Sequence, residues 1–139
     1  MVRASWFEIP VVDLDRAIDF YERVFLVELE RDTVDGHDAA YFPATDGPIG
    51  AAGALMHGES YIPSLDGTRI YLGVDDIEAV VARGVEAGGS VLYPVTTVDD
   101  QLVAEISDSE GNRIALQIRR RLTRPDSVVR GRARARGGT

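Results

Sequence analysis

The sequence predicts an α+β fold of two βαβββ modules, with helices outside a curled mixed β-sheet that surrounds a cavity. Residues 7–21 and 70–84 each contain a short apolar strand, an aspartate cap and a helix with a periodic apolar face. Short alternating runs typical of strands follow each copy. Because an internal repeat limits the fold closely, we expect a ligand to bind in the concave surface between the two copies.

In the first copy, residues 4–12 alternate as a strand, with Phe7 and Ile9 on one side and Trp6 and Glu8 on the other. Asp13 is predicted to cap a helix that ends near residue 25 or 26. Further strands are predicted at 27–33, 38–43 and 50–57, with turns at 35–36 and 46–48.

The second copy repeats this order after a crossing segment at 58–67. A strand is predicted at 68–74, and Asp75 or Asp76 is expected to cap the next helix. Gly88 and Gly89 are a suitable helix stop. The remaining strands are predicted at 90–95, 101–107 and 112–119, with the last turn at 108–111.

The length of 139 residues indicates one domain. We expect it to span 1–118, with module one at 4–58, module two at 67–118 and a tail at 119–139. The absence of cysteine excludes disulfides, thiolate metal sites and thiol nucleophiles. No apolar run is long enough to cross a bilayer and no N-terminal signal is visible, so a cytoplasmic protein without a membrane partner is expected.

Charge is divided unevenly along the chain. Residues 1–118 hold 7 Arg against 22 acidic residues, a net charge of −15, whereas residues 119–139 hold 8 Arg against Asp126 alone, a net charge of +7. An acidic body disfavours nucleic acid as a partner of the folded domain. The tail is expected to be disordered or held against the body. A solvated tail is the preferred explanation, and binding of nucleic acid or an acidic protein is the alternative.

Five phrases together resemble the vicinal oxygen chelate superfamily, the group of glyoxalase I, bleomycin-resistance proteins and extradiol dioxygenases. They stand at residues 7–11, 13–21, 67–76, 86–89 and 108–116, and the resemblance covers 4–118. It implies a small-molecule-binding protein that forms a homodimer. Relatives commonly have glycine after the position of Phe25, so Leu26 is expected to adopt a strained backbone or to change the helix stop.

Metal-using relatives place His, Glu or Gln ligands on the first and last strands of each copy. By resemblance these positions fall on Trp6, Arg69, Ala115 and the stretch 51–54 (Ala-Ala-Gly-Ala), whose side chains cannot coordinate a divalent cation. His37 is predicted in a solvated turn, and His57 with scattered carboxylates makes a poor metal site. We therefore expect no metal and no other cofactor.

The alternation within each strand places one set of side chains in the core and the opposite set toward the cavity. This lining would suit a flat or partly aromatic organic ligand with one or two polar groups. Tyr61 and Tyr93 are further candidates for the cavity mouth, although strand and loop tyrosines often serve packing. The candidate ligand-binding residues are Trp6, Glu8, Tyr41, His57, Arg69, Tyr71, Arg113 and Gln117.

These residues are compatible with several functions. The leading prediction is a metal-free binding protein. The alternative is a lyase- or isomerase-like enzyme in which Glu8 and Arg69 carry proton transfer, although the two could instead pair with each other. A metal-dependent glyoxalase or dioxygenase is disfavoured by the missing ligands, and an interaction protein acting through the tail is a further alternative.

Overall fold

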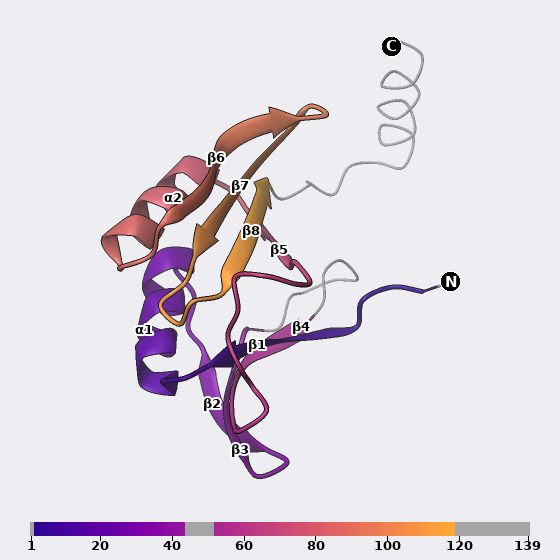
Figure 1. The fold of residues 1–139 in the computed structure, drawn as a ribbon, viewed down its shortest axis with the longest axis vertical. Coiled ribbons are helices and arrows are strands. Elements are labelled where there is room, and N and C mark those ends of the chain that lie inside the picture. The colour runs from indigo at the N-terminus through magenta and orange to yellow at the C-terminus, as the bar shows by residue number, and fades with distance from the viewer. Residues whose placement is uncertain (1, 44–51, 119–139) are drawn as a thin grey trace.

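The computed structural model describes residues 2–43 and 52–118, and these contain the predicted βαβββ order twice. Both helices lie on one side of the molecule and the strands lie on the other (Figure 1). The turn predicted at 46–48 and the tail at 119–139 lie outside the described residues. The first module consists of β1 (Trp6–Val11), α1 (Leu14–Phe25), β2 (Glu30–Val34), β3 (His37–Tyr41) and β4 (Ala52–His57). The second consists of β5 (Tyr71–Val74), α2 (Ile77–Glu86), β6 (Val91–Val98), β7 (Gln101–Ser107) and β8 (Arg113–Ile118).

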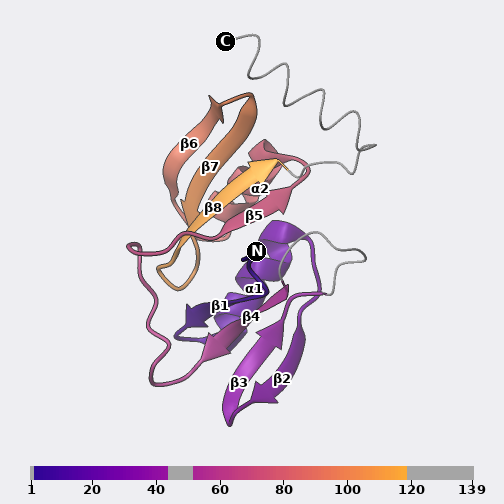
Figure 2. The ribbon, with the colours of Figure 1, turned by 90° about the vertical axis from the view of Figure 1, so that its right-hand side faces the viewer.

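Each module has its own four-stranded mixed sheet, as Figure 2 shows. The strand orders are β1-β4-β3-β2 and β5-β8-β7-β6. β1 pairs with β4 and β5 with β8 in parallel, and the other pairs are antiparallel. The α+β class and the repeat are thus confirmed. Within the described residues no strand pairing joins the two sheets, so the curled surface is divided between them.

Local signals explain both helices. Asp13 and Asp76 are the N-caps, and their carboxylates accept hydrogen bonds from Arg16 N at 3.0 Å and Ala79 N at 3.1 Å. At the end of α1, Leu26 adopts the left-handed conformation, with φ 54° and ψ 48°. The strained backbone expected there is confirmed. The second helix has Ala87 as its C-cap, and the left-handed conformation follows at Gly88, with φ 104°, where glycine carries no steric cost.

The strand boundaries differ from the prediction by a few residues. The strand expected at 68–74 begins only at Tyr71, although Ile70 O still accepts a hydrogen bond from Ala115 N at 3.0 Å. The strand expected at 27–33 begins at Glu30. Upstream of it, Leu29 N donates to the Glu22 carboxylate at 2.8 Å. The backbone N–H of Leu29 is thus satisfied by a side chain and not by a neighbouring strand, so strand pairing starts only after Leu29.

One apolar core serves both modules. It contains Phe20 and Val24 of α1, Val80 of α2 and Ile106 of β7, all of them buried. The two helices also contact each other, and Arg83 Nε donates to Val24 O at 2.9 Å. Because burial of apolar surface is the main stabilising contribution, this shared core stabilises the contact between the two modules. Within the described residues, no helix is long and apolar enough to cross a membrane.

A polar network at the turn between β7 and β8 holds this turn against the first module. Tyr21 Oη donates to Asp108 Oδ2 at 2.5 Å, and Asn112 Nδ2 donates to Pro10 O at 2.8 Å. Asp108 and Asn112 are buried. Burial first, and then the charge of Asp108, raises the pKa of Tyr21 well above its usual range, so the phenol keeps its proton.

Glu110 of the same turn caps the start of α1 from the other module. Its Oε1 accepts from Val12 N at 2.9 Å and Asp13 N at 2.8 Å, and its Oε2 accepts from Arg16 Nε at 2.8 Å. Burial acts to raise the pKa of Glu110, but these hydrogen bonds and one from Ser109 outweigh it and lower that pKa to about 2. We call this turn, residues 108–112, the clamp.

Candidate functional site

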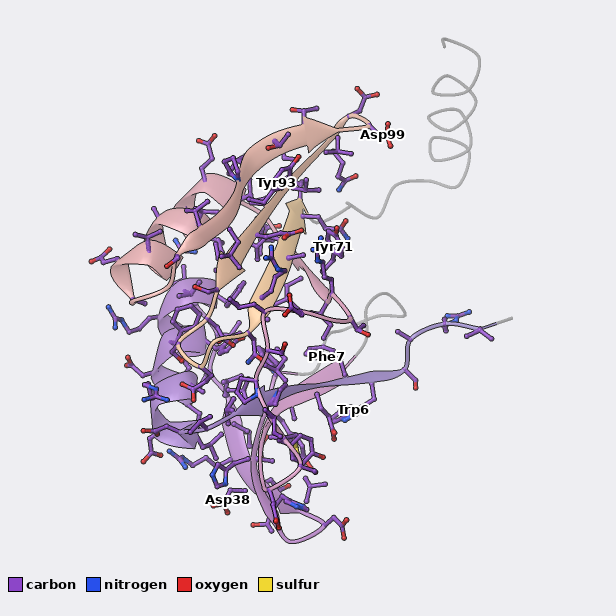
Figure 3. The ribbon with its side chains drawn as sticks, in the orientation of Figure 1. Trp6, Phe7, Asp38, Tyr71, Tyr93 and Asp99 are labelled. Carbon is purple, nitrogen blue, oxygen red and sulfur yellow. The ribbon has the colours of Figure 1, made fainter. Side chains whose placement is uncertain are left out.

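Each sheet has one face covered by its helix and one face turned away from the helices. Facing residues of paired strands share a face, so the register defines what each open face carries. On the first sheet, Glu8 and Tyr41 both lie opposite Ala54. The helix-facing set, by contrast, contains core residues such as Ile9, as the alternation predicts. Figure 3 shows Trp6 and Tyr71 on the side of the strands away from the helices.

On the open face of the first sheet, Glu8 is the central polar group. Trp6 Nε1 donates to Glu8 Oε2 at 3.1 Å, and Tyr61 Oη donates to Glu8 Oε1 at 2.9 Å. The hydrogen bond to Glu8 is the largest cause that raises the pKa of Tyr61. Trp6 also meets Tyr41 edge to face, with ring centroids 5.8 Å apart. The aromatic rings and the carboxylate therefore form one connected group.

The crossing segment between the modules packs on this first face. Its Tyr61 lies against a small apolar cluster of Ala39, Ala54 and Met56, which are buried. The His37 ring meets Tyr61 edge to face at 5.7 Å. The prediction that His37 lies in a solvated turn is wrong, because His37 begins β3 and is half-buried by this contact. The first face is thus partly filled by the chain itself.

On the open face of the second sheet, one carboxylate joins two guanidinium groups. Arg69 Nη1 donates to Glu105 Oε2 at 3.1 Å, and Arg113 Nη1 donates to Glu105 Oε1 at 2.5 Å. Arg113 Nε also donates to Leu65 O at 2.9 Å. Glu105 is only 7% exposed, and a buried carboxylate requires such partners. Sequence reasoning missed Glu105, although a lone acidic residue on the cavity-facing side of a strand is a usable signal.

The pairing of Glu8 with Arg69, left open by the sequence, is not what the structure contains. Glu8 bonds to Trp6 and Tyr61, whereas Arg69 bonds to Glu105. The physical reason is that β1 and β5 belong to different sheets and pair with β4 and β8. Each charged residue therefore finds a partner on its own sheet or on the crossing segment.

The predicted ligand-binding residues fall into two groups. His57 is exposed at the end of β4, opposite Val11 and on the other face of the sheet from Ala54, so it belongs to neither group. Gln117 of β8 lies opposite Gly73 and Val103 and is half-buried. The structure thus brings together Trp6, Glu8 and Tyr41 on the first sheet and, separately, Arg69, Tyr71, Arg113 and Gln117 on the second.

Two hollows lie at the junction of the modules. The larger, of about 680 Å³, is on the helix-facing side, and its lining includes Phe7, Phe42, Leu72 and Arg83. None of the predicted ligand-binding residues lines it. The smaller, of about 240 Å³, lies beside the crossing segment, and its lining includes Glu8 and Arg113. The smaller hollow is therefore lined by one residue of each group.

The donor atoms needed for a divalent metal are absent from the expected positions. Trp6 and Arg69 are on or beside the first strands, and Ala54 and Ala115 are on the last strands. Indole, guanidinium and methyl side chains do not ligate a divalent cation. Among residues 2–43 and 52–118 there is also no group of three or more His, Asp or Glu that could hold one. This set of residues does not fit the metal of metal-using relatives.

Comparison with known families and structures gives a consistent result. The model of the Glyoxalase/Bleomycin resistance protein/Dioxygenase superfamily matches residues 3–116. No protein with a curated description matches the chain.

Similar solved structures share the fold at low sequence identity. A hypothetical protein, SA1046 from S. aureus, is 22% identical, with a TM-score of 0.61 over 85% of this chain and 98% of that one. TioX from Micromonospora sp. is 22% identical, with a TM-score of 0.61 over 86% of this chain and 100% of that one. Glyoxalase I from Zea mays is 21% identical, with a TM-score of 0.59, and 81% of this chain matches 44% of that one.

Proposed function

Because the chain belongs to the glyoxalase/bleomycin resistance protein/dioxygenase superfamily, we propose that it binds a small organic molecule without a divalent metal site. The observation that carries this proposal is the exposure of large aromatic side chains on the open sheet faces. Trp6 is 45% exposed, Tyr71 50% and Tyr93 39%. Aromatic rings beside a few fixed polar groups are typical of sites for flat ligands.

The polar groups beside these rings are held in place by hydrogen bonds. Glu8 is bonded to Trp6 and Tyr61, and Glu105 is bonded to Arg69 and Arg113. Fixed donors and acceptors lower the entropy cost of binding, because fewer side chains must be ordered when the ligand arrives. This arrangement supports binding and orientation of a ligand on either face.

We include a homodimer in this proposal. Both open faces carry exposed apolar side chains, and a second copy of the chain placed against them would cover the rings and enclose a ligand. A site between two copies would also bring the first sheet of one subunit opposite the second sheet of another. Such an arrangement would be isologous, with two equivalent sites.

Native mass spectrometry of the purified protein tests the proposal directly. The expected result is a dimer without metal mass, from which denaturation releases any organic molecule that purified with it. The single tryptophan, Trp6, then reports binding of candidate planar ligands through its fluorescence, with the same titration of free tryptophan as the control for non-specific quenching. One divalent metal per subunit, or no saturable binding by any planar compound tested, would contradict the proposal.

A second candidate function is metal-free proton transfer by Glu8. It is favoured by the 2.9 Å hydrogen bond between Glu8 and Tyr61, which gives the carboxylate a neighbouring proton donor on an open face. Arg69 would have to act from another subunit, because it lies on the other sheet of the same chain. Glu8→Gln would then abolish deuterium uptake by a bound ligand and leave its affinity unchanged, whereas a pure binding protein would catalyse no uptake.

A further inference from the structure

We propose that the open face of the second sheet binds the carboxylate of a planar organic anion through Arg69 and Arg113. This inference rests on the proposed function and narrows it to one face and one ligand charge. Both guanidinium groups bind the carboxylate of Glu105. Arg69 Nη1 donates to Oε2 at 3.1 Å, and Arg113 Nη1 donates to Oε1 at 2.5 Å.

The two arginines keep free hydrogen-bond donors after their contacts with Glu105. A guanidinium has five N–H donors in a planar fork that matches a carboxylate. Arg69 uses Nη1 for Glu105, and Arg113 uses Nη1 for Glu105 and Nε for Leu65 O. Within the described residues, Nε and Nη2 of Arg69 and Nη2 of Arg113 have no protein acceptor. These atoms are available to a second carboxylate.

The charge of this cluster differs from that of the rest of the body. Two guanidinium groups share one carboxylate, so the cluster carries a net charge of +1 on a body whose net charge is −15 over residues 1–118. Elsewhere in the described residues, Arg16, Arg23 and Arg31 are each paired with a carboxylate of their own. An acidic surface repels anions in general, so this cationic cluster on an open face favours the binding of an anion there.

The surface around the two arginines suits the flat part of such a ligand. The residues Tyr71, Ala115, Glu105 and Tyr93 lie opposite one another across four strands and therefore share a face. The two tyrosines are among the exposed large side chains, and Ala115 adds no bulk between them. An aromatic ring can stack on a tyrosine or on a guanidinium plane while its carboxylate meets the free donors.

The competing explanation is a structural one. Arg69 and Arg113 attach the end of the crossing segment to β7 and β8, since Arg113 Nε bonds to Leu65 O and Arg113 N bonds to Ser64 O at 3.2 Å. A purely structural cluster would not distinguish ligands by charge. Arg69 is the better residue for a test, because half of its side chain is exposed and, among residues 2–43 and 52–118, its only partner is Glu105.

The test uses three probes of the same shape: benzoate, the neutral benzamide and the cationic benzamidine. We would titrate each into the uniformly labelled full chain and follow backbone amide and arginine Nε–Hε signals by NMR. Benzoate is expected to bind saturably and to shift signals of Tyr71, Arg69 and Arg113 more than the other two probes do. Loss of one charge-assisted hydrogen-bonding partner predicts about tenfold weaker benzoate binding in Arg69→Gln.

Matched variants separate recognition from net charge. Arg23→Gln removes an equally exposed, ion-paired arginine from α1 and should leave benzoate binding unchanged. Arg69→Lys keeps the charge but loses the planar fork, so it should restore only part of the affinity. Equal binding of benzoate and benzamide, equal loss in Arg69→Gln and Arg23→Gln, or no benzoate binding would each overturn the inference. Binding of benzamide or benzamidine without an anion preference would overturn it and leave the proposed function standing.

Discussion

The two modules share a backbone plan but differ in what their open faces carry. The first face is partly filled by the crossing segment, with Tyr61 over the buried Ala54 and Met56, and its central charge is the carboxylate of Glu8. The second face leaves Tyr71 exposed, and its charged cluster has a net charge of +1. The repeated backbone therefore determines which face a side chain lies on, whereas the residue types of each module determine the charge and chemistry of that face.

The largest effect should follow from separating the modules at the clamp. Glu110→Ala removes the acceptor for two backbone N–H groups and for Arg16, and its side chain has no exposed surface. Leaving these donors unpaired should lower the free energy of unfolding by about 3 kcal/mol. Chemical denaturation measures this change. As a control, Asp19→Asn breaks an exposed ion pair within α1 and should cost less than about 0.5 kcal/mol.

Acid should weaken the same contact. Because folding lowers the pKa of Glu110 from 4.5 to about 2, its contribution is complete above about pH 4.5 and is lost as the pH falls toward 2. Denaturation of wild type and Glu110→Gln across this range isolates that contribution from other carboxylates. The stability difference between the two proteins should be constant above pH 5 and shrink below it. A difference that stays constant down to pH 2.5 would contradict the assignment.

The filled and open faces can be compared at one pair of positions. Met56 and Gln117 each lie two residues after the alanine of the last strand, Ala54 or Ala115, on the same face as that alanine. Met56→Ala should cost about 2–3 kcal/mol, because Met56 is buried beneath the crossing segment. Gln117→Ala should cost less than about 1 kcal/mol. Similar costs at both positions would mean that the two faces are equally packed.

The smallest effect concerns the different helix ends of the two modules. At the end of α1, Leu26 adopts a strained left-handed backbone conformation, whereas after α2 this conformation is adopted by Gly88. Leu26→Gly should therefore raise the free energy of unfolding by about 0.5–1 kcal/mol, because glycine adopts this conformation freely. The thermal midpoint provides the measurement, with Gly88→Ala expected to lower it. A destabilised Leu26→Gly would indicate that the Leu26 side chain contributes packing that outweighs the strain.

Local patterns predicted the backbone well because their physical causes are local. The caps at Asp13 and Asp76 and the turn at 35–36 follow from a few neighbouring residues, whereas the strained Leu26 was expected from the resemblance. Alternation also separated Phe7 and Ile9 of the first strand, which pack in the core, from Trp6 and Glu8 on the open face.

Partners distant in the sequence could not be predicted in this way. Arg69 and Glu105 are 36 positions apart, and Tyr61 and Glu8 are 53 apart. Alternation assigns each side chain to a face but contains no information about which strand lies beside it. For the same reason, the sequence placed His37 in a solvated turn, although the crossing segment returns to cover it.

The clamp also has a consequence for how the chain folds during synthesis. Glu110 bonds to Val12 and Asp13, which lie 98 and 97 positions earlier in the sequence. The ribosome therefore completes almost the whole domain before the start of α1 receives its final hydrogen bonds. Contacts that close so long a loop slow folding. Until they form, the apolar core residues of the first module stay exposed to solvent. The turn between β7 and β8, the last one along the described residues, is thus among the contacts that join the two modules.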